Sequence, residues 1–461
     1  MRKCSYGLAI IIVFTSLLLV GCGIKETNVE TYAKLKESQP QKIQIADLSD
    51  AWDTILNNST KAFIGGHPID ETFLSMVTHE YGEKTVQEIA SYANFETPEI
   101  WYELTGKSIH VLWYDYCKST GIKNYSFDRI HEIDIDGEDI VLDFTGDVSF
   151  SDGVATTDYM DHQIGGITEC FSEDLLAEMR SADVMMINNE FAYTTRGAAL
   201  EGKAYTFRSA PSRVSLLEEL GVDIVSVANN HVFDYGETGL LDTLDTLRGA
   251  NMPFVGAGVN LEEARKPVYF IAGGRKIAIC SATQIERTLN FTQEATGILP
   301  GVLKCLHPEI FCDVIREAKA NADYVIVIPH WGTEGNANYG EDQVALARSF
   351  VEAGADVIIG GHTHCLQTVE YMDNVPIFYS LGNYWFSITG EMPADYHTGL
   401  AQIRISKDGH IDANFIPCEF SSGVTSLLNN KDKAYSDIID SLNSLSSTAL
   451  IDKEGHITKK Q

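Results

Sequence analysis

The sequence predicts an α/β fold built around a largely buried sheet, and three observations support this expectation. From about residue 139 onward, short apolar runs rich in β-branched residues alternate with amphipathic stretches of helical period, which is typical of strand–helix units. Apolar residues make up 44% of the chain, which permits a sizeable core. Polar motifs follow several of the expected strands at their carboxyl ends, where α/β folds gather ligand-binding residues.

The apolar runs and the amphipathic stretches give the expected elements in chain order. Strands are expected at residues 140–144, 184–187, 223–227, 276–280, 324–328, 356–359, 366–371 and 377–380. Helices are expected at residues 172–179, 212–220, 239–248, 308–320 and 341–353. This alternation indicates helices packed on the faces of the sheet.

Residues 46–135 precede this region and are expected to form a small helical unit. Apolar side chains recur there at three- and four-residue spacings within residues 72–93 and 100–119, which predicts a helix in each segment. The residues that carry this pattern are Phe73, Met76, Val77, Ile89, Trp101, Leu104, Leu112 and Trp113. Nothing in this unit indicates a function.

Residues 1–22 are expected to be the signal peptide of a bacterial lipoprotein. A basic head precedes an apolar run at residues 8–20, which is too short to span a bilayer as a helix and suits a signal peptide. The motif that ends at Cys22 resembles the lipobox, where cleavage exposes a cysteine for acylation. Lipid on Cys22 would anchor the protein to the cell membrane on its extracytoplasmic face. An ordinary signal peptide with a chance cysteine is the alternative.

The rest of the chain is longer than one average domain, so we expect a large domain with accessory segments. Residues 23–45 are polar and lack periodicity, which predicts a flexible tether. Residues 136–420 are expected to form the main domain. Residues 421–461 are expected to be a short appendage with one helix at residues 431–442.

The charge and the cysteines exclude several classes of protein. A formal net charge of −31 argues against binding to nucleic acid and against attraction to anionic lipid headgroups. Nine cysteines are present, but the number left after the signal peptide and the acylated cysteine is odd and irregularly spaced, so no disulfide framework is expected. Cys280 is expected to be a buried thiol, and Cys365 either a packed neighbour of the site or a soft metal ligand.

Two carboxylates follow the first two expected strands of the main domain. Gly146 is expected to let the backbone turn sharply, so that Asp147 points into a cleft. A carboxylate in this place is a natural ligand for a divalent ion. Glu190 ends the next strand after two asparagines, and there it can bridge two metal ions.

An Asn-Asn-His motif follows the third expected strand. Asn230 offers a neutral oxygen ligand, and His231 beside it can act as a general acid or hold the leaving group. Asp234 lies three residues further on and can orient His231 through a hydrogen bond.

Three histidines follow later strands. His330 ends one strand, and His362 and His364 alternate along an expected extended segment, which would place both on one face to embrace one ion or to contact two. Carboxylates, an amide and imidazoles form a mixed nitrogen and oxygen ligand set that suits a two-metal hydrolytic site. The sequence therefore predicts a metal-dependent hydrolase.

Three further residues are candidates for substrate binding. Arg208 can clamp a carboxylate or a phosphate with two hydrogen bonds, or it can form a surface ion pair. Glu334 can serve as a ligand, a base or a partner of His330. Asn383 is expected to lie near the cleft.

Over about residues 139–390 the chain resembles the CapA family, the metallophosphatase-like proteins of poly-γ-glutamate capsule synthesis. The resemblance implies a fold similar to calcineurin-like metallophosphoesterases, a four-layer α/β/β/α sandwich with a dinuclear site. It rests on Phe144-Thr145-Gly146-Asp147-Val148, Asn188-Asn189-Glu190, Asn229-Asn230-His231-x-x-Asp234, His330-Trp331-Gly332-x-Glu334, Gly361-His362-x-His364 and Tyr379-Ser380-Leu381-Gly382-Asn383.

The resemblance also implies roles for individual residues. His231 would be catalytic, and the metal ligands would be Asp147, Glu190, Asn230, His330, His362 and, as a further ligand, His364. The chain departs from the wider metallophosphoesterase pattern at two places. Ser149 stands where a histidine is usual, and Glu190 stands where a bridging aspartate is common. A second metal ion is then held weakly, differently or not at all.

Two hypotheses about function follow. The first is a surface-anchored hydrolase that uses one or two divalent ions, Mn, Zn or Fe, to cleave a phosphoester or an amide in an anionic polymer. The second is a non-catalytic component that binds the polymer within a capsule synthesis or export complex. The negative charge opposes a polyanionic substrate unless metal ions and Arg208 make the site locally positive.

Overall fold

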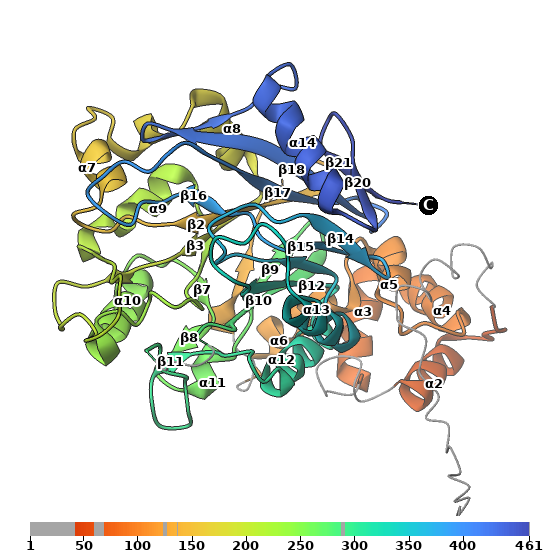
Figure 1. Ribbon diagram of the computed structural model, residues 1–461. Coiled ribbons are helices and arrows are strands. Elements are labelled where there is room, and N and C mark those ends of the chain that lie inside the picture. The colour runs from red at the N-terminus through yellow and green to blue at the C-terminus, as the bar shows by residue number, and fades with distance from the viewer. Residues whose placement is uncertain (1–41, 60–68, 123–126, 136, 287–290, 461) are drawn as a thin grey trace, which may run out of the picture. The chain divides into compact units, whose positions relative to one another are not determined.

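Two β-sheets organise the chain, and the larger one has ten strands (Figure 1). Its strands run in the order β20-β21-β18-β17-β2-β3-β6-β7, with β16 paired to β2 and β19 paired to β18. The neighbours from β2 to β7 are parallel, whereas β17 is antiparallel to β2. The bounds are β2 Ile140–Val148, β3 Val184–Asn189, β6 Ile224–Ser226, β7 Phe254–Val255, β16 Asn383–Trp385, β17 Tyr396–Ile405, β18 Ile411–Ser421, β19 Val424–Leu427, β20 Ala449–Ile451 and β21 His456–Lys459.

The second sheet has seven strands in the order β1-β9-β10-β12-β13-β15-β14. Its central strands β10, β12, β13 and β15 are parallel. The bounds are β1 Ile130–Glu132, β9 Val268–Ala272, β10 Arg275–Thr283, β12 Tyr324–His330, β13 Val357–Ile359, β14 Val369–Met372 and β15 Val375–Phe378. Two small two-stranded sheets pair β4 Ala192–Tyr193 with β5 Arg208–Ser209 and β8 Ala257–Gly258 with β11 Gly301–Val302.

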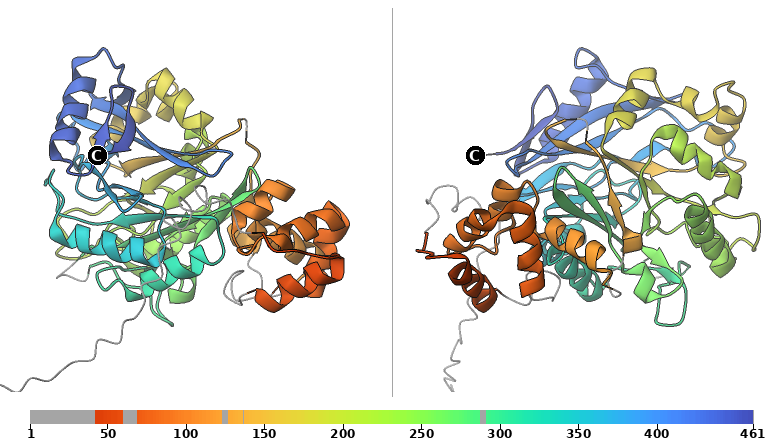
Figure 2. Two further views of the ribbon diagram at one scale, coloured as in Figure 1. Left: turned by 90° about the vertical axis from the view of Figure 1, so that its right-hand side faces the viewer. Right: turned by 180° about the vertical axis from the view of Figure 1, so that it is seen from behind.

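Helices cover the outer face of each large sheet. The ten-stranded sheet carries α7 Ala155–Asp161, α8 Glu173–Ser181, α9 Ser215–Leu220 and α10 Gly236–Gly249, with the 3-10 helices η2 Gly166–Cys170 and η3 Pro211–Val214. The seven-stranded sheet carries α12 Glu309–Lys319 and α13 Glu341–Ala353, which lie side by side (Figure 2). The short helix α11 is Leu261–Ala264, and α14 is Lys433–Leu445.

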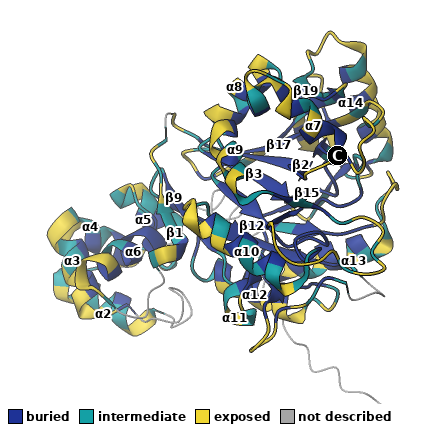
Figure 3. Cartoon of the chain, turned by 90° about the vertical axis from the view of Figure 1, so that its left-hand side faces the viewer, coloured by how far each residue is buried: buried dark blue, intermediate teal, exposed yellow. Residues whose placement is uncertain are grey.

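The alternation of side chains along the strands shows that the layers are α/β/β/α. Leu142 and Phe144 of β2 pack against Ile277 and Ile279 of β10 in a core between the two sheets. Met185 and Ile187 of β3 face the opposite way, into a second core with the helices, and Ala278 and Cys280 of β10 lie in a third core. Figure 3 shows that the strands are buried on both faces, whereas the helices expose their outer sides. The predicted four-layer sandwich is confirmed.

The described residues of the expected helical unit form five helices: α2 precedes the two predicted segments, and glycines divide each of those segments into two helices. Gly82 has a φ of 89° and separates α3 from α4, and Gly106 has a φ of 75° and ends α5. Only glycine adopts these angles without strain. The helices are α2 Leu48–Asn58, α3 Glu71–Tyr81, α4 Glu83–Ser91, α5 Pro98–Thr105 and α6 Ile109–Thr120, followed by η1 Phe127–Arg129.

The C-terminal residues continue the larger sheet and do not form an appendage. The strand β19 pairs with residues 418–421 of β18, and β21 pairs with Ala413 and Asn414 of the same strand. The strand β20 pairs with β21 and forms the edge of the sheet. The helix α14 buries Tyr435, Ile438, Ile439 and Leu442 in the core between the sheets. The long strands β17 and β18, which the alternation of apolar runs did not predict, provide the edge on which these strands assemble.

The structure, a computed structural model, describes residues 42–59, 69–122, 127–135, 137–286 and 291–460. The expected signal peptide with Cys22, and the expected tether up to residue 41, lie outside the described residues. Within the described ranges, no helix combines the length and the apolar character needed to cross a membrane. The seven cysteines found there are all free thiols.

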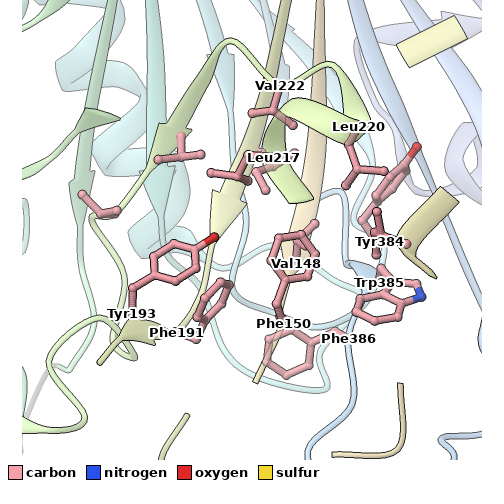
Figure 4. Packing of buried hydrophobic residues seen from close by; sticks show 14 of the residues in the cluster. Val148, Phe150, Phe191, Tyr193, Leu217, Leu220, Val222, Tyr384, Trp385 and Phe386 are labelled. Carbon is pink, nitrogen blue, oxygen red and sulfur yellow. The ribbon is translucent and has the colours of Figure 1, made fainter. Parts of the chain in front are cut away.

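An aromatic cluster fixes the strand ends that carry the site (Figure 4). Phe150 follows β2, Phe191 follows β3 and Trp385 lies on β16, and all three are buried. The ring of Phe150 lies 5.5 Å from that of Phe191 and 6.0 Å from that of Trp385. Contacts at these distances hold three chain segments together, immediately beside the polar residues described next.

Candidate metal centre

Five potential metal ligands meet at the carboxyl ends of β2, β3, β12 and β13. They form two groups whose ligand atoms lie within 4.8 Å of one another, and both groups contain Glu190. One group adds His330 and His362 to Glu190, and the other adds Asp147 and His364. This geometry suits a carboxylate shared between two neighbouring cations. The structure brings these five residues together, and their role as metal ligands stays a prediction.

Asp147 is fully buried and accepts hydrogen bonds from three sides. Its Oδ1 accepts a bond from Asn188 Nδ2 at 2.8 Å, its Oδ2 accepts one from the main-chain N–H of His362 at 3.2 Å, and His364 Nδ1 lies 3.5 Å from Oδ2. Burial alone would raise the pKa of Asp147, but the bond to His364 and the charges of His330 and His364 hold it well below its usual range. The side chain is therefore a carboxylate, the form that binds a cation.

Glu190 carries the clearest sign that the site is built for a cation. Its side chain is fully buried, and its Oε2 accepts a hydrogen bond from Asn188 Nδ2 at 3.0 Å, whereas Oε1 has no hydrogen-bond partner among the residues that the structure describes. That orphaned oxygen lies 3.7 Å from His330 Nε2 and 4.0 Å from His231 Nε2. Burial and the charge of Asp147 raise its pKa well above the ordinary value. A divalent cation would satisfy Oε1 and offset both effects, so the residues present fit a metal ion.

The buried histidines are neutral, as metal ligands must be. Burial lowers the pKa of His330 to about 3, and burial is also the largest cause that lowers the pKa of His362 well below its ordinary value. His330 Nε2 lies 2.8 Å from Asn230 Oδ1 and 3.1 Å from His362 Nδ1. The predicted ligand Asn230 therefore lies at the centre with the histidines, although it is an amide and belongs to neither carboxylate–histidine group.

The prediction that His362 and His364 alternate along a strand is wrong. They have φ values of 93° and 58°, so they lie in a turn after β13 whose backbone is in the left-handed region. The turn nevertheless brings both rings to the site, with centroids 6.0 Å apart. Conformations of this kind persist where surrounding contacts impose them, which is common at functional sites.

His231 and Asp234 form the hydrogen-bonded pair that the motif predicted. His231 Nδ1 lies 2.7 Å from Asp234 Oδ2, and both side chains are buried. The same carboxylate accepts bonds from the main-chain N–H of Phe207 at 2.6 Å and from Lys203 Nζ at 2.6 Å. Burial lowers the pKa of His231. Because Asp234 occupies Nδ1, the other ring nitrogen faces Glu190 and is available to exchange a proton.

The predicted substrate-binding residues differ in their positions. Asn383 Oδ1 lies 2.7 Å from His364 Nδ1, so Asn383 orients that ring. Glu334 lies 4.0 Å from His362 Nε2, beside His362 and not beside His330, and its side chain is 61% exposed. The guanidinium of Arg208 stacks 4.6 Å from the ring centroid of Tyr235. Its role as an anion clamp stays a prediction.

Two residues near the site are packed neighbours of the ligands. Cys365 donates a weak hydrogen bond to the carbonyl of Thr363 and belongs to neither ligand group, so the first of its two expected roles is the one the structure supports. Ser149, which stands where a histidine is usual in the wider pattern, shares a 2.7 Å hydrogen bond with Ser151 and is buried. Its hydroxyl is therefore engaged away from the ligand groups.

Sequence reasoning missed three residues that hold the site together. The amide of Asn188 donates to both Asp147 and Glu190 and fixes their separation. Asn229 donates to Asn188 and accepts from the main-chain N–H of His231. Lys203, which no motif singled out, contacts Asp234. The doubled asparagines at 188–189 and 229–230 were the only signal for the first two.

Gly146 is needed for close packing and not for the sharp turn that the sequence suggested. It lies within β2, and the register of β2 shifts between Phe144 and Asp147. A Cβ atom on Gly146 would lie 1.9 Å from the carbonyl oxygen of Gly382. The Gly146→Ala variant is therefore expected to lose metal binding and about 1–3 kcal/mol of unfolding free energy, since the strand must move.

Elemental analysis and thermal unfolding of Gly146→Ala test this expectation. Gly249→Ala provides the matched control, because a Cβ atom at the end of α10 meets nothing within 4 Å. The control should retain metal and be as stable as the parent chain or slightly more stable. Equal metal content and stability in both variants would contradict the packing role of Gly146.

Comparisons with known proteins give a consistent family. The model of the family "Bacterial capsule synthesis protein PGA_cap" matches residues 141–387, slightly more than half of the chain. "PGA biosynthesis protein CapA" of Bacillus subtilis (strain 168) is 36% identical over 198 residues, which cover 42% of this chain and 50% of that protein. "Capsule biosynthesis protein CapA" of Bacillus anthracis is 34% identical over 236 residues, 48% of this chain and 54% of that protein. The chain thus spans about half the length of these curated relatives.

Two solved structures are similar at a lower level. The 5'-nucleotidase from Candida albicans SC5314 has a TM-score of 0.35 at 12% identity, and the match covers 61% of this chain and 52% of that one. The protein TT1561 of Thermus thermophilus has a TM-score of 0.32 at 9% identity, with coverage of 56% and 92%. At this level neither structure indicates a reaction for this chain.

Proposed function

Because this chain belongs to the bacterial capsule synthesis protein family PGA_cap, we propose that it is a metal-dependent hydrolase of capsule polymer synthesis or processing. The observation that carries the proposal is the buried Oε1 of Glu190, which has no hydrogen-bond partner among the described residues, on the one residue that belongs to both groups of histidines and carboxylates. A buried carboxylate oxygen without a partner calls for an explanation, and a bound cation would supply one.

Glu190 and the residues around it would hold one or two divalent ions. The full set is Asp147, Glu190, Asn230, His330, His362 and His364. The nitrogen and carboxylate ligands admit Mn, Zn or Fe. When bound, such an ion supplies Lewis-acid polarisation of the bond under attack and stabilises the developing negative charge. Asn188 keeps the two carboxylates apart, and Asn383 keeps the His364 ring turned toward Asp147.

His231 supplies the proton chemistry of the proposed reaction. Asp234 holds Nδ1, so Nε2 is directed at the same space as the orphaned oxygen of Glu190. From this position His231 donates a proton to the leaving group, and Asp234 stabilises the imidazolium before that transfer. Arg208 is proposed to bind a carboxylate or phosphate of the substrate.

The proposed substrate is poly-γ-glutamate or a phosphoester of the capsule machinery, cleaved at an amide or at an ester. The names of the Bacillus relatives refer to PGA and to capsule biosynthesis, which supports an anionic polymer. The net charge of −31 opposes such a substrate at long range. Cations at the site would reverse the sign of the local field where the polymer must bind.

A polymer-binding component without catalytic activity is the second candidate, and Ser149 favours it. The hydroxyl of Ser149 is bonded to Ser151 and offers no nitrogen ligand where the wider pattern has a histidine. A site that lacks one ligand for the second ion could hold the polymer through a single ion without cutting it.

We also propose that lipid on Cys22 keeps the protein on the extracytoplasmic face of the membrane.

Metal analysis and hydrolysis assays on the full chain separate these candidates. We expect one to two metal ions per chain and Mn²⁺-dependent hydrolysis of a diaryl phosphodiester or of poly-γ-glutamate. The His362→Ala variant should lose turnover, whereas His410→Ala, which changes an exposed histidine in the turn between β17 and β18, should not. Metal without turnover on either substrate would favour the binding component, and the absence of both would refute the proposal.

A further inference from the structure

Asp234 anchors the loop between β4 and β5 at three points. The main-chain N–H of Leu200 donates to the Asp234 carbonyl at 2.9 Å, and the N–H of Phe207 donates to its carboxylate at 2.6 Å. Lys203 lies between them and donates to the other carboxylate oxygen at 2.6 Å. Three donors from one short segment therefore converge on the residue that orients His231.

Lys203 is unusual because its charged end lies inside the protein. Its side chain is only 8% exposed, and its ammonium contacts Asp234 and, at 3.4 Å, Glu286 Oε1. Removing an ammonium group from water costs free energy, and the two carboxylates offset this cost. Without such partners, a buried charge would strongly destabilise the fold. The lysine is therefore held in one place by the groups that surround it.

The same ammonium also contacts the chain at a candidate metal ligand. Lys203 Nζ donates to the main-chain carbonyl of Asn230, which also accepts a hydrogen bond from Thr292 Oγ1 at 2.9 Å. The side chain of Asn230 points to His330. One cation thus restrains both the backbone of Asn230 and the carboxylate that turns His231.

We propose that Lys203 is a positioning residue that fixes the His231–Asp234 pair relative to the metal ligand Asn230. Without its ammonium, one oxygen of the buried Asp234 loses its partner, and the carboxylate can rotate away from His231 Nδ1. The ring of Phe207, whose centroid lies 4.5 Å from that of His231, belongs to the same loop and would shift with it. The kinetic part of this inference rests on the proposed hydrolase function.

Two substrates whose leaving groups differ in their need for a proton can show whether Lys203 positions His231 or only supports the fold. A nitrophenolate leaves without a proton, whereas a phenolate benefits from a proton donated by His231. In Lys203→Met, kcat for a phenyl phosphodiester should fall about 10–100-fold, while kcat for the nitrophenyl ester and the metal content should change by less than about threefold. Lys203→Arg, which keeps the charge, should recover most of the loss.

Histidine ring NMR tests the same inference without turnover. The ¹⁵N signals of His231 in the metal-free full chain are identified by their loss in His231→Gln. In the parent chain and in Lys203→Arg, the hydrogen should reside on Nδ1, and in Lys203→Met it should be divided between both nitrogens. If the parent chain hydrolyses nothing, the proposed function fails, yet this spectrum still decides the role of Lys203.

Lys304→Met is the matched control for the loss of one buried lysine. Lys304 is 9% exposed and also lies in the field of Glu286, and it has no hydrogen bond to Asp234 among the contacts of the described residues. It should keep both kcat values and the Nδ1 tautomer. An unchanged tautomer in Lys203→Met, or an equal fall of kcat for both esters, would overturn the proposal.

Discussion

Replacing Glu190 with glutamine should abolish metal binding and lower the rate of hydrolysis more than about 100-fold. This loss is larger than the roughly 10–100-fold loss that is typical when a residue that only supports a ligand is changed. Glu190 belongs to both ligand groups, so the change removes an anionic ligand from each. An amide keeps the shape of the side chain but is a weak ligand for a divalent cation. Elemental analysis and the phosphodiester assay measure the two losses.

The same variant should not be less stable than the parent chain when metal is absent. The folded-state pKa of Glu190 is raised well above the ordinary 4.5, so the folded protein holds this proton more tightly than the unfolded chain. The contribution of Glu190 is therefore fully present below about pH 4.5 and is lost as pH rises through the folded pKa. Denaturant unfolding of Glu190→Gln should lack this loss of unfolding free energy toward neutral pH.

Glu334→Gln is the control for the removal of a carboxylate near the histidines. Its side chain is largely exposed and 4.0 Å from His362. We expect its metal content to equal that of the parent chain. If Glu190→Gln retained the parent's metal content and turnover, the shared carboxylate would not be a ligand, and the interpretation of the site would be wrong.

Replacing His231 with glutamine should lower kcat by about 10²–10⁴ for a phenyl ester, which is the usual contribution of a general acid. The loss should be small for a nitrophenyl ester, and metal content should be unchanged because His231 belongs to neither ligand group. Asp234→Asn should show the same dependence on the leaving group with a smaller loss. Steady-state kinetics with the two esters measure these effects.

The exposed His410 offers a control for His231, since its ring pairs only with the exposed Asp412 at 3.6 Å among the contacts of the described residues. His410→Gln should keep the parent's kcat for both esters. An equal loss for both esters in His231→Gln, or a loss of metal, would mean that His231 supports the ligands and does not donate a proton.

The positions of several candidate ligands followed from the sequence because each of them comes at the end of an apolar run. Parallel strands bring their carboxyl ends to one edge of a sheet, so Asp147 and Glu190 could be placed together before the fold was known. His330 ends β12 of the other sheet, so only the family resemblance placed it with them. The order of strands in the two sheets, and the antiparallel strands β17 and β18, could not be predicted. Their pairing depends on contacts between residues far apart in the chain.

The details that escaped prediction depend on backbone conformation and on long-range contacts. The left-handed turn at His362 and His364 has no glycine at these two positions to signal it. Gly82 could have indicated the break between α3 and α4, but the apolar spacing continues across it and predicted one helix. Lys203 contacts residues 27 and 31 positions away, and a lysine in a polar loop gives no sign that its ammonium will be buried.

Anomalous diffraction from a crystal of the full chain grown with Mn²⁺ tests the central claim most directly. We expect a peak at the metal edge among Glu190, His330 and His362, and a second peak among Asp147, Glu190 and His364 if the chain binds two ions. A peak in the first position alone would still support a metal centre. Crystals that contain Mn²⁺ in solution but show no anomalous density at Glu190 would contradict it.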